Sequence, residues 1–138
     1  MLKKNLLLTL LAVFSLLAIT TSCEKTEPIH LVSDTNLKGQ NTIAVPAEGG
    51  TIHVTCTNYE SFSIYKYSFT VDKQAFKDPN STAISPFSST PWLKSAVNKN
   101  VLTVVVEPNT TSEVRITIFE ITAGDVRTRL RFEQEAKK

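Results

Sequence analysis

Cysteine, histidine and glycine are scarce in this chain of 138 residues, which has 2 cysteines, 2 histidines and 4 glycines. Once Cys23 is set aside for the reason given below, Cys56, His30 and His53 are one ligand short of a structural zinc site. The glycines form neither a phosphate-binding loop nor the turn that exposes a nucleophilic serine. We therefore expect no metal site and no cofactor.

A net charge is also missing from the part of the chain that we expect to be retained. Lys and Arg number 15 and Asp and Glu number 13, but Lys3 and Lys4 lie in a segment that we expect to be removed. Nucleic-acid binding requires a clustered excess of cations, so nucleic acid is not an expected partner. The acidic residues are scattered, and nothing in the sequence places any two of them at the fixed separation across a cleft that a glycosidase requires. We expect a protein that is not an enzyme.

The apolar run over residues 6–19 is too short for a transmembrane helix, which needs about 20 apolar residues. Two lysines precede it, and the small polar residues 20–22 follow it. This order predicts a secretory signal peptide. Cys23, directly after small residues, resembles the lipobox of bacterial lipoproteins. We predict a lipoprotein signal peptide over residues 1–22 and lipid attachment at Cys23; the alternative is ordinary cleavage nearby, which leaves a free thiol.

A diacylated cysteine would hold the protein firmly at a membrane, because two or more acyl chains give stable anchoring. Residues 23–40 are polar and lack a clear period, which predicts a flexible tether. Glu24 and Glu27 resemble the acidic residues that follow the cysteine in surface-exported lipoproteins of the Bacteroidetes. We expect a lipid-anchored protein of the cell outer membrane, with a surface-exposed and a periplasm-facing orientation both open.

From residue 42 onward the hydrophobic pattern has a period of two, which is typical of strands. The pattern changes phase inside residues 61–71, which predicts a bulge or a crossing between sheets. Residues 101–106 are apolar on both faces apart from one threonine, which predicts a central, covered strand. About seven short strands over residues 41–135 predict an all-β fold, an immunoglobulin-like two-sheet antiparallel β-sandwich. Residues 72–91, with three prolines, are expected to be a long connection.

Four segments in the right order resemble the BACON domain, the Bacteroidetes-associated carbohydrate-binding domain that is often N-terminal. They are residues 45–52 (VPAEGGTI), 91–93 (PWL), 104–110 (VVVEPNT) with 115–118 (RITI), and 130–134 (LRFEQ). The resemblance implies an immunoglobulin-like sandwich without catalytic activity of its own. It also implies a role in carbohydrate binding, because members of the family stand beside glycan-degrading and adhesion modules.

The aromatic residues are the candidate glycan contacts. A sandwich of this size usually buries its one tryptophan, so we expect Trp92 in the core. Four other aromatic residues lie in or beside loops or on the phase-switched strand, and their alternative role is ordinary packing. These candidate contacts are Tyr59, Tyr65, Tyr67 and Phe87.

Two further patterns bear on function. Cys56 and His53 are three residues apart on a strand and therefore lie on opposite faces, which predicts a core cysteine rather than a catalytic pair. Arg127, Arg129 and Arg131 (the arginine stripe) share one face of the last strand. This stripe is either an anion site for sulfated or phosphorylated glycans, or a solvated face or edge strand whose charges discourage pairing.

Two functions of different class follow. The first is a lipid-anchored module that binds a polysaccharide or mucin-type glycan, or assists a carbohydrate-utilisation or adhesion system. The second is a structural protein, a spacer or subunit that contacts other envelope proteins and binds no sugar. Exposed aromatic residues in the 72–91 connection would favour the first, and a flat apolar patch would favour the second.

Overall fold

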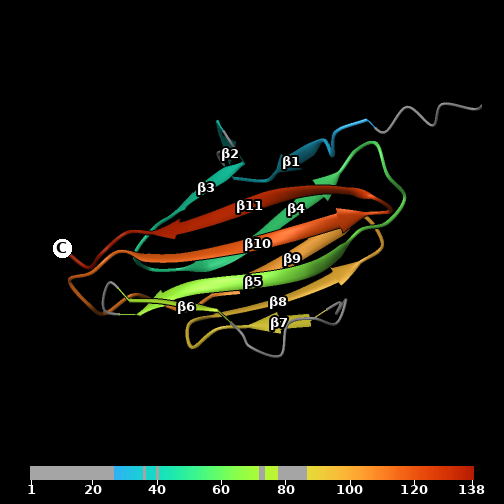
Figure 1. The fold of residues 1–138 in the computed structure, drawn as a ribbon. Coiled ribbons are helices and arrows are strands. Elements are labelled where there is room, and N and C mark those ends of the chain that lie inside the picture. The colour runs from blue at the N-terminus through green and yellow to red at the C-terminus, as the bar shows by residue number, and fades with distance from the viewer. Residues whose placement is uncertain (1–26, 36, 40, 72–73, 78–86) are drawn as a thin grey trace, which may run out of the picture.

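The computed structural model describes residues 27–138 apart from 36, 40, 72–73 and 78–86. The predicted signal peptide, Cys23 and Glu24 lie outside the described residues. The described residues form eleven strands (Figure 1): β1 (Leu31–Ser33), β2 (Leu37–Lys38), β3 (Thr42–Val45), β4 (Gly50–Cys56), β5 (Ser63–Val71), β6 (Gln74–Lys77), β7 (Phe87–Ser89), β8 (Leu93–Asn98), β9 (Val101–Val106), β10 (Arg115–Ala123) and β11 (Val126–Gln134). Among the described residues, there is no helix long and apolar enough to cross a membrane.

The strands form two sheets that pack face to face (Figure 1). The first sheet has the order β1-β4-β9-β8-β7, and the second has the order β2-β3-β11-β10-β5-β6. Immunoglobulin-like sandwiches have the orders ABED and GFC. Strands β1, β4, β9 and β8 correspond to A, B, E and D, and β11, β10 and β5 correspond to G, F and C. The predicted fold class is confirmed, although short flanking strands raise the strand count from the expected seven to eleven.

The core lies between the sheets and follows from the period-two pattern. On β4, Ile52, Val54 and Cys56 are buried while His53 is exposed. This arrangement confirms that Cys56 is a core residue on the face opposite His53. The facing layer comes from the second sheet, where the rings of Phe119 and Phe132 meet edge to face at 5.6 Å.

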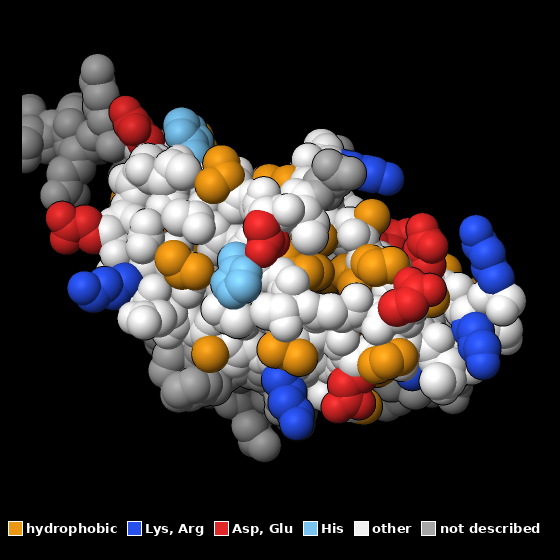
Figure 2. Space-filling model, turned by 180° about the vertical axis from the view of Figure 1, so that it is seen from behind, with side chains coloured by type: hydrophobic (Ala, Val, Ile, Leu, Met, Phe, Trp, Pro, Cys, Tyr) orange, Lys and Arg blue, Asp and Glu red, His pale blue; other side chains and the backbone are white. Residues whose placement is uncertain are grey.

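Strand β9 is central, as predicted, because it pairs with β4 on one side and β8 on the other. The expectation that both of its faces are covered is wrong. Leu102 and Val104 are buried, but the side chain of Val105 is 46% exposed. The outer face of the first sheet has no layer over β9 within the described part of the chain. Figure 2 shows this face, with hydrophobic side chains near its middle and most charged side chains near its margins.

The phase switch in β5 is a β-bulge, the first of the two predicted alternatives, and β5 does not cross between the sheets. The pairing of β5 with β10 shifts register between Glu120 and Ile121. Ile64 pairs with Ile121 before the shift, and Tyr67 pairs with Phe119 after it. The extra residue lets both Ile64 and Tyr67 face the core.

Strand β11 is an edge strand in its first half alone, so the edge-strand interpretation of the arginine stripe is wrong for Arg131. It pairs with β10 along its whole length and, in parallel, with β3 over residues 131–134. Among the described residues, 126–130 have a strand partner only on the β10 side. The stripe marks the outer face of the second sheet, and an open edge borders it only beside Arg127 and Arg129.

The folded domain begins earlier than the predicted boundary at residue 41. Ile29 is only 6% exposed, and β1 pairs with β4. The side chain of Asn58 accepts a hydrogen bond from the His30 backbone at 2.9 Å and donates one to the Pro28 carbonyl at 2.7 Å. The tether prediction is therefore wrong for the segment from Ile29 onward, because contacts with a loop almost thirty residues away hold it on the domain.

The predicted connection over residues 72–91 contains two short strands. Strand β6 pairs with β5 in the second sheet, and β7 pairs with β8 at the edge of the first. Residues 78–86 lie outside the described residues.

Candidate functional site

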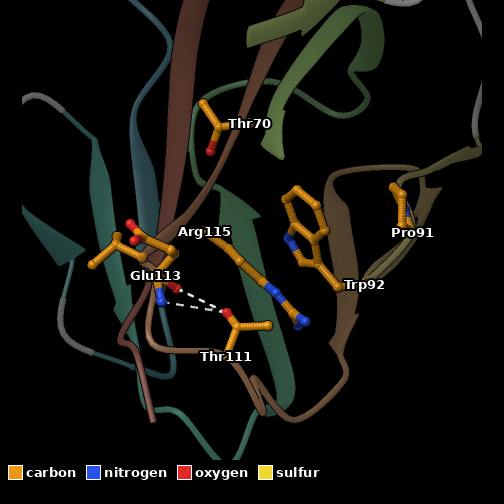
Figure 3. A pocket seen from close by; sticks show the side chains of 7 residues that line it. Thr70, Pro91, Trp92, Thr111, Glu113 and Arg115 are labelled. Atoms are coloured by element: carbon orange, nitrogen blue, oxygen red, sulfur yellow. Dashed lines mark hydrogen bonds between the residues drawn. The ribbon is translucent and has the colours of Figure 1, made fainter. Parts of the chain in front are cut away.

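A pocket of about 170 Å³ lies at one end of the sandwich (Figure 3). The end of β5, the turn before β8 and the connection between β9 and β10 meet there. Ligand pockets for drug-sized molecules have about 300–1,000 Å³, so this one fits a small molecule or one terminal group. It is lined by Thr70, Pro91, Trp92, Thr111, Glu113, Val114 and Arg115.

Asn109, which is buried, holds the β9–β10 connection in shape. Its amide nitrogen donates hydrogen bonds to the carbonyls of Glu113 at 2.8 Å and Glu135 at 2.9 Å. Its amide oxygen accepts hydrogen bonds from the backbone N–H and the hydroxyl of Thr111, at 3.0 and 2.7 Å. This role of Asn109 was not predicted from the sequence, although an asparagine two residues before a threonine in a loop is typical of such a turn.

Gln134, which is also buried, stabilises the connections at this end of the sandwich by hydrogen bonds to their backbone. Its amide nitrogen donates to the carbonyl of Glu107 at 2.8 Å and also lies within hydrogen-bond distance of the Pro46 and Ala47 carbonyls. The Gln134 Oε1 atom is buried without a hydrogen-bond partner among the described residues. This single side chain ties the last strand to two connections at the pocket end.

Trp92 is 6% exposed, as predicted for a core residue. The edge-to-face contact with Phe69 has a centroid distance of 5.5 Å and an angle of 85°. The guanidinium carbon of Arg115 lies 5.3 Å from the centroid of the indole. The ring is therefore occupied by protein contacts and reaches the pocket without offering an open face for stacking.

Arg115 crosses the pocket between Thr111 and Trp92 (Figure 3). One of its nitrogens, Nη1, donates a hydrogen bond to the Pro108 carbonyl at 3.3 Å. Among the described residues, no carboxylate lies within salt-bridge distance of this guanidinium. The carboxylate of Glu113 points away from it in the close-up (Figure 3).

The three predicted glycan contacts with described side chains, Tyr59, Tyr65 and Tyr67, do not form one site. Tyr59 packs against the core and donates a hydrogen bond to the Glu27 carbonyl, at the end of the sandwich where the chain enters. Tyr67 packs against the core and stacks on Phe69 with a centroid distance of 6.5 Å. Tyr65 lies beside the cations of Arg127 and Lys66. Phe87 pairs with Ala96 in the first sheet, and its side chain lies outside the described part of the structure.

The arginine stripe is partly neutralised by neighbouring carboxylates. Arg129 lies 3.3 Å from Glu120, and Arg131 lies 3.0 Å from Glu133. Arg127 instead stacks over the ring of Tyr65, with 4.2 Å between the guanidinium carbon and the ring centroid. Between a solvated face and an anion site, the solvated face fits these pairings better.

A polar contact on the first sheet ties the bend after β1 to β4. The Asp34 carboxylate accepts a hydrogen bond from the His53 backbone at 2.9 Å and lies 2.8 Å from His53 Nδ1. The backbone N–H of His53 is the main cause that lowers the pKa of Asp34, and desolvation opposes it. In the described part of the chain, no group of three or more potential metal ligands comes together.

Comparisons with known proteins bear on the fold alone. No family model matches the chain, and no curated protein matches it. Among solved structures, the chain is similar to the NMR structure of a protein from Bacteroides thetaiotaomicron, with a TM-score of 0.67 and 24% sequence identity. The match covers 81% of this chain and 90% of that chain. The chain thus has the same sandwich fold as this bacterial protein.

Proposed function

We propose that this chain is a non-catalytic, lipid-anchored protein of the cell outer membrane whose BACON-like sandwich binds a glycan in the pocket beside Trp92 and Arg115. It serves as a binding or accessory module of a carbohydrate-utilisation or adhesion system. The observation that carries the proposal is the position of this pocket at the end of the sandwich opposite the entry of the chain.

The two ends are identified by strand β8. It starts beside the pocket at Leu93 and ends at Asn98, next to the turn where the Asn100 carbonyl accepts a hydrogen bond from the Cys56 backbone. Thr57, which follows Cys56, donates its backbone N–H to the His30 carbonyl at 2.9 Å, so this end of the sandwich also holds the first described residues. The first described residues therefore lie at the end away from the pocket.

Chain length connects this geometry to the proposed anchor. Three residues separate Cys23 from Glu27, a path that spans at most about 14 Å when fully extended. A lipid on Cys23 would keep the entry end of the sandwich close to the bilayer. The pocket would then face away from the membrane, where a glycan can reach it.

The pocket has the mixture of groups that a sugar ring requires. Thr70 Oγ1 accepts a hydrogen bond from the Ile116 backbone at 3.1 Å, which leaves the hydroxyl proton to donate. Arg115 supplies further donors, and Pro91 and Val114 supply apolar surface. A pyranose presents hydroxyls at its rim and C–H groups on its faces, and this lining matches both.

The anchor is tested by metabolic labelling with a fatty-acid probe. Cys23→Ala should abolish both the label and membrane association, because it removes the attachment site. Cys56→Ala is the matched control, since it removes a buried thiol and should keep the label. Label retained in Cys23→Ala would contradict the lipoprotein proposal.

Sugar binding is tested on a glycan array with the chain lacking residues 1–23. Val114 lies at the pocket and is 47% exposed, whereas the equally exposed Val105 lies on the outer face of the first sheet. Val114→Glu should remove the binding signals by blocking the pocket, and Val105→Glu should keep them. An array without any signal, or equal signals for the two variants, would contradict glycan binding at this pocket.

The second candidate function, a subunit that contacts another envelope protein, is favoured by the outer face of the first sheet. Val32 and Val105 are exposed there, and Thr51, which pairs with Val105, adds a further uncharged side chain. Exposed apolar patches are typical of protein–protein contacts. The same two variants separate the candidates, because loss of a co-purified envelope protein in Val105→Glu, with Val114→Glu unaffected, would favour this second function.

A further inference from the structure

We infer that the pocket selects an acidic sugar, a terminal ring whose carboxylate or sulfate ester is bound by the guanidinium of Arg115. This inference rests on the proposed function, since it specifies the ligand of the same pocket. It depends on three features of Arg115: its unused donors, its missing counter-charge and its fixed position.

The first feature is the number of unused donors. A guanidinium carries five N–H groups in a planar fork that matches the oxygens of a carboxylate or a sulfate. Arg115 uses one nitrogen on the Pro108 carbonyl. The remaining N–H groups have no hydrogen-bond partner among the described residues, and they lie at a pocket.

The second feature is the missing counter-charge. On the outer face of the second sheet, Arg129 and Arg131 each have a carboxylate within 3.3 Å. Arg115 has none within 4.0 Å among the described residues. A half-buried cation without a carboxylate partner attracts an anion more strongly than a paired one, because no protein charge cancels its field.

The third feature is its fixed position. The stacking of Arg115 on Trp92 restrains the guanidinium, and Trp92 is itself held by Phe69. The Asn109 hydrogen bonds hold the opposite wall of the pocket, which includes Thr111. A pre-positioned fork loses little side-chain entropy when a ligand binds, which raises the affinity for a matching anion.

The size of the pocket restricts the ligand to one ring. About 170 Å³ leaves no room for a longer chain inside, so the ring enters from a chain end and the rest of the glycan stays outside. The Thr70 hydroxyl is placed to bind a ring oxygen or hydroxyl beside the anionic group.

The test is a titration of the full-length chain, kept in a polyoxyethylene detergent that contains no sugar. Three probes are compared by isothermal calorimetry: methyl β-D-glucuronide, glucose 6-sulfate and the neutral methyl β-D-glucoside. At least one acidic probe should bind about tenfold more tightly than the neutral probe, as expected for a charge-assisted contact. That preference should decrease as salt rises from roughly 0.05 to 0.5 M. The better acidic probe identifies the anionic group.

Variants assign the preference to Arg115. Arg115→Gln should bind the acidic and neutral probes about equally, and Arg115→Lys should keep part of the preference because the charge remains without the fork. Arg129→Gln removes an exposed arginine elsewhere on the second sheet and should behave like the native chain. Thermal denaturation of each variant checks that it is folded, and if Arg115→Gln fails that check, the comparison of Arg115→Lys with Arg129→Gln decides.

The outcomes separate this inference from the proposed function. Equal affinities for all three probes in the native chain would overturn the acidic-sugar inference and leave glycan binding in place. A preference that survives in Arg115→Gln, or no binding of either acidic probe, would also overturn it. The array variants at Val114 and Val105 decide glycan binding independently.

Discussion

Replacing Trp92 with alanine should strongly destabilise the protein, because the indole is a core side chain that also forms one wall of the pocket. Its side chain is 6% exposed. Large aromatic residues buried in this way lose about 3–5 kcal/mol of unfolding free energy when they are truncated to alanine. The edge-to-face contact with Phe69 places Trp92 in the upper half of that range, since such pairs contribute about 0.5–1.5 kcal/mol beyond burial.

This loss converts into a large change in melting temperature. A domain of about one hundred residues changes its midpoint by about 4 °C for each kcal/mol, so a loss in the upper half of the range, about 4–5 kcal/mol, should lower the midpoint by about 16–20 °C. Native domains typically have about 5–15 kcal/mol of stability. The variant should therefore remain folded at room temperature in most of that range, and its melting transition should be measurable.

The assay is thermal and urea denaturation followed by circular dichroism, because the variant lacks the chain's one tryptophan and therefore has no tryptophan fluorescence to follow. Trp92→Phe is the matched control. It keeps an aromatic ring against Phe69 and should lose less than half as much stability. An unchanged midpoint in Trp92→Ala, combined with weaker glycan binding, would refute the core assignment and make Trp92 a ligand platform.

Three further predictions concern the surface and the turns. Replacing the arginine stripe with threonine should leave the protein monomeric in analytical ultracentrifugation, because β3 leaves β11 only a short unpaired edge over residues 126–130, and very short edges are poor templates for pairing. Each lost surface ion pair should cost at most about 1 kcal/mol. Self-association would show that this short edge is enough to pair with a second chain. Asp34→Asn should be less stable than the native chain at neutral pH, and this difference in stability should disappear as the pH falls through the lowered pKa of Asp34, below about 4. Urea titrations at pH 7 and pH 3 measure the difference, and a difference that grows in acid would contradict the prediction. Gly49→Ala should destabilise the protein far more than Gly124→Ala in the same urea assay. Both glycines have positive φ, but only at Gly49 would a Cβ overlap the Val106 carbonyl oxygen. Equal losses of stability would show that the turn at Gly49 can move.

Strand positions were predictable where burial alternates along one segment. The predicted strand over residues 101–106 has the bounds of β9, along which buried residues alternate with partly or fully exposed ones. The bulge in β5 was predictable for the same reason, because a phase change in one strand reports a change in which face is buried. Each of these features depends on residues within one stretch of chain.

Features that depend on distant partners were not predictable. Leu31–Ser33 has the polar surroundings of a tether, and it is a strand because β4 offers it a free edge. The arginine stripe fits a solvated face, and the open edge that it also suggested is limited to residues 126–130 in the described part of the chain. Charged side chains indicate that one face of a sheet is exposed to solvent. Whether a strand lies at an edge depends instead on whether another backbone pairs alongside it, as β3 does with residues 131–134 of β11.

The candidate site shows the same limit more sharply, because the residues of the pocket come from three segments that are far apart in the sequence. Tyrosines near loops were reasonable candidates, yet Tyr59 and Tyr67 use their rings for packing. Arg115, the residue that we propose to bind the anionic group, starts a strand and begins one of the segments that resemble the BACON domain, but nothing in its sequence context marks it as a binding residue. It becomes a binding group only because Asn109 and Gln134 hold the neighbouring connections and Trp92 lies under its guanidinium. The buried polar residues that stabilise this end of the sandwich are therefore also the ones that shape its pocket, so a change in either amide should alter ligand affinity and stability together.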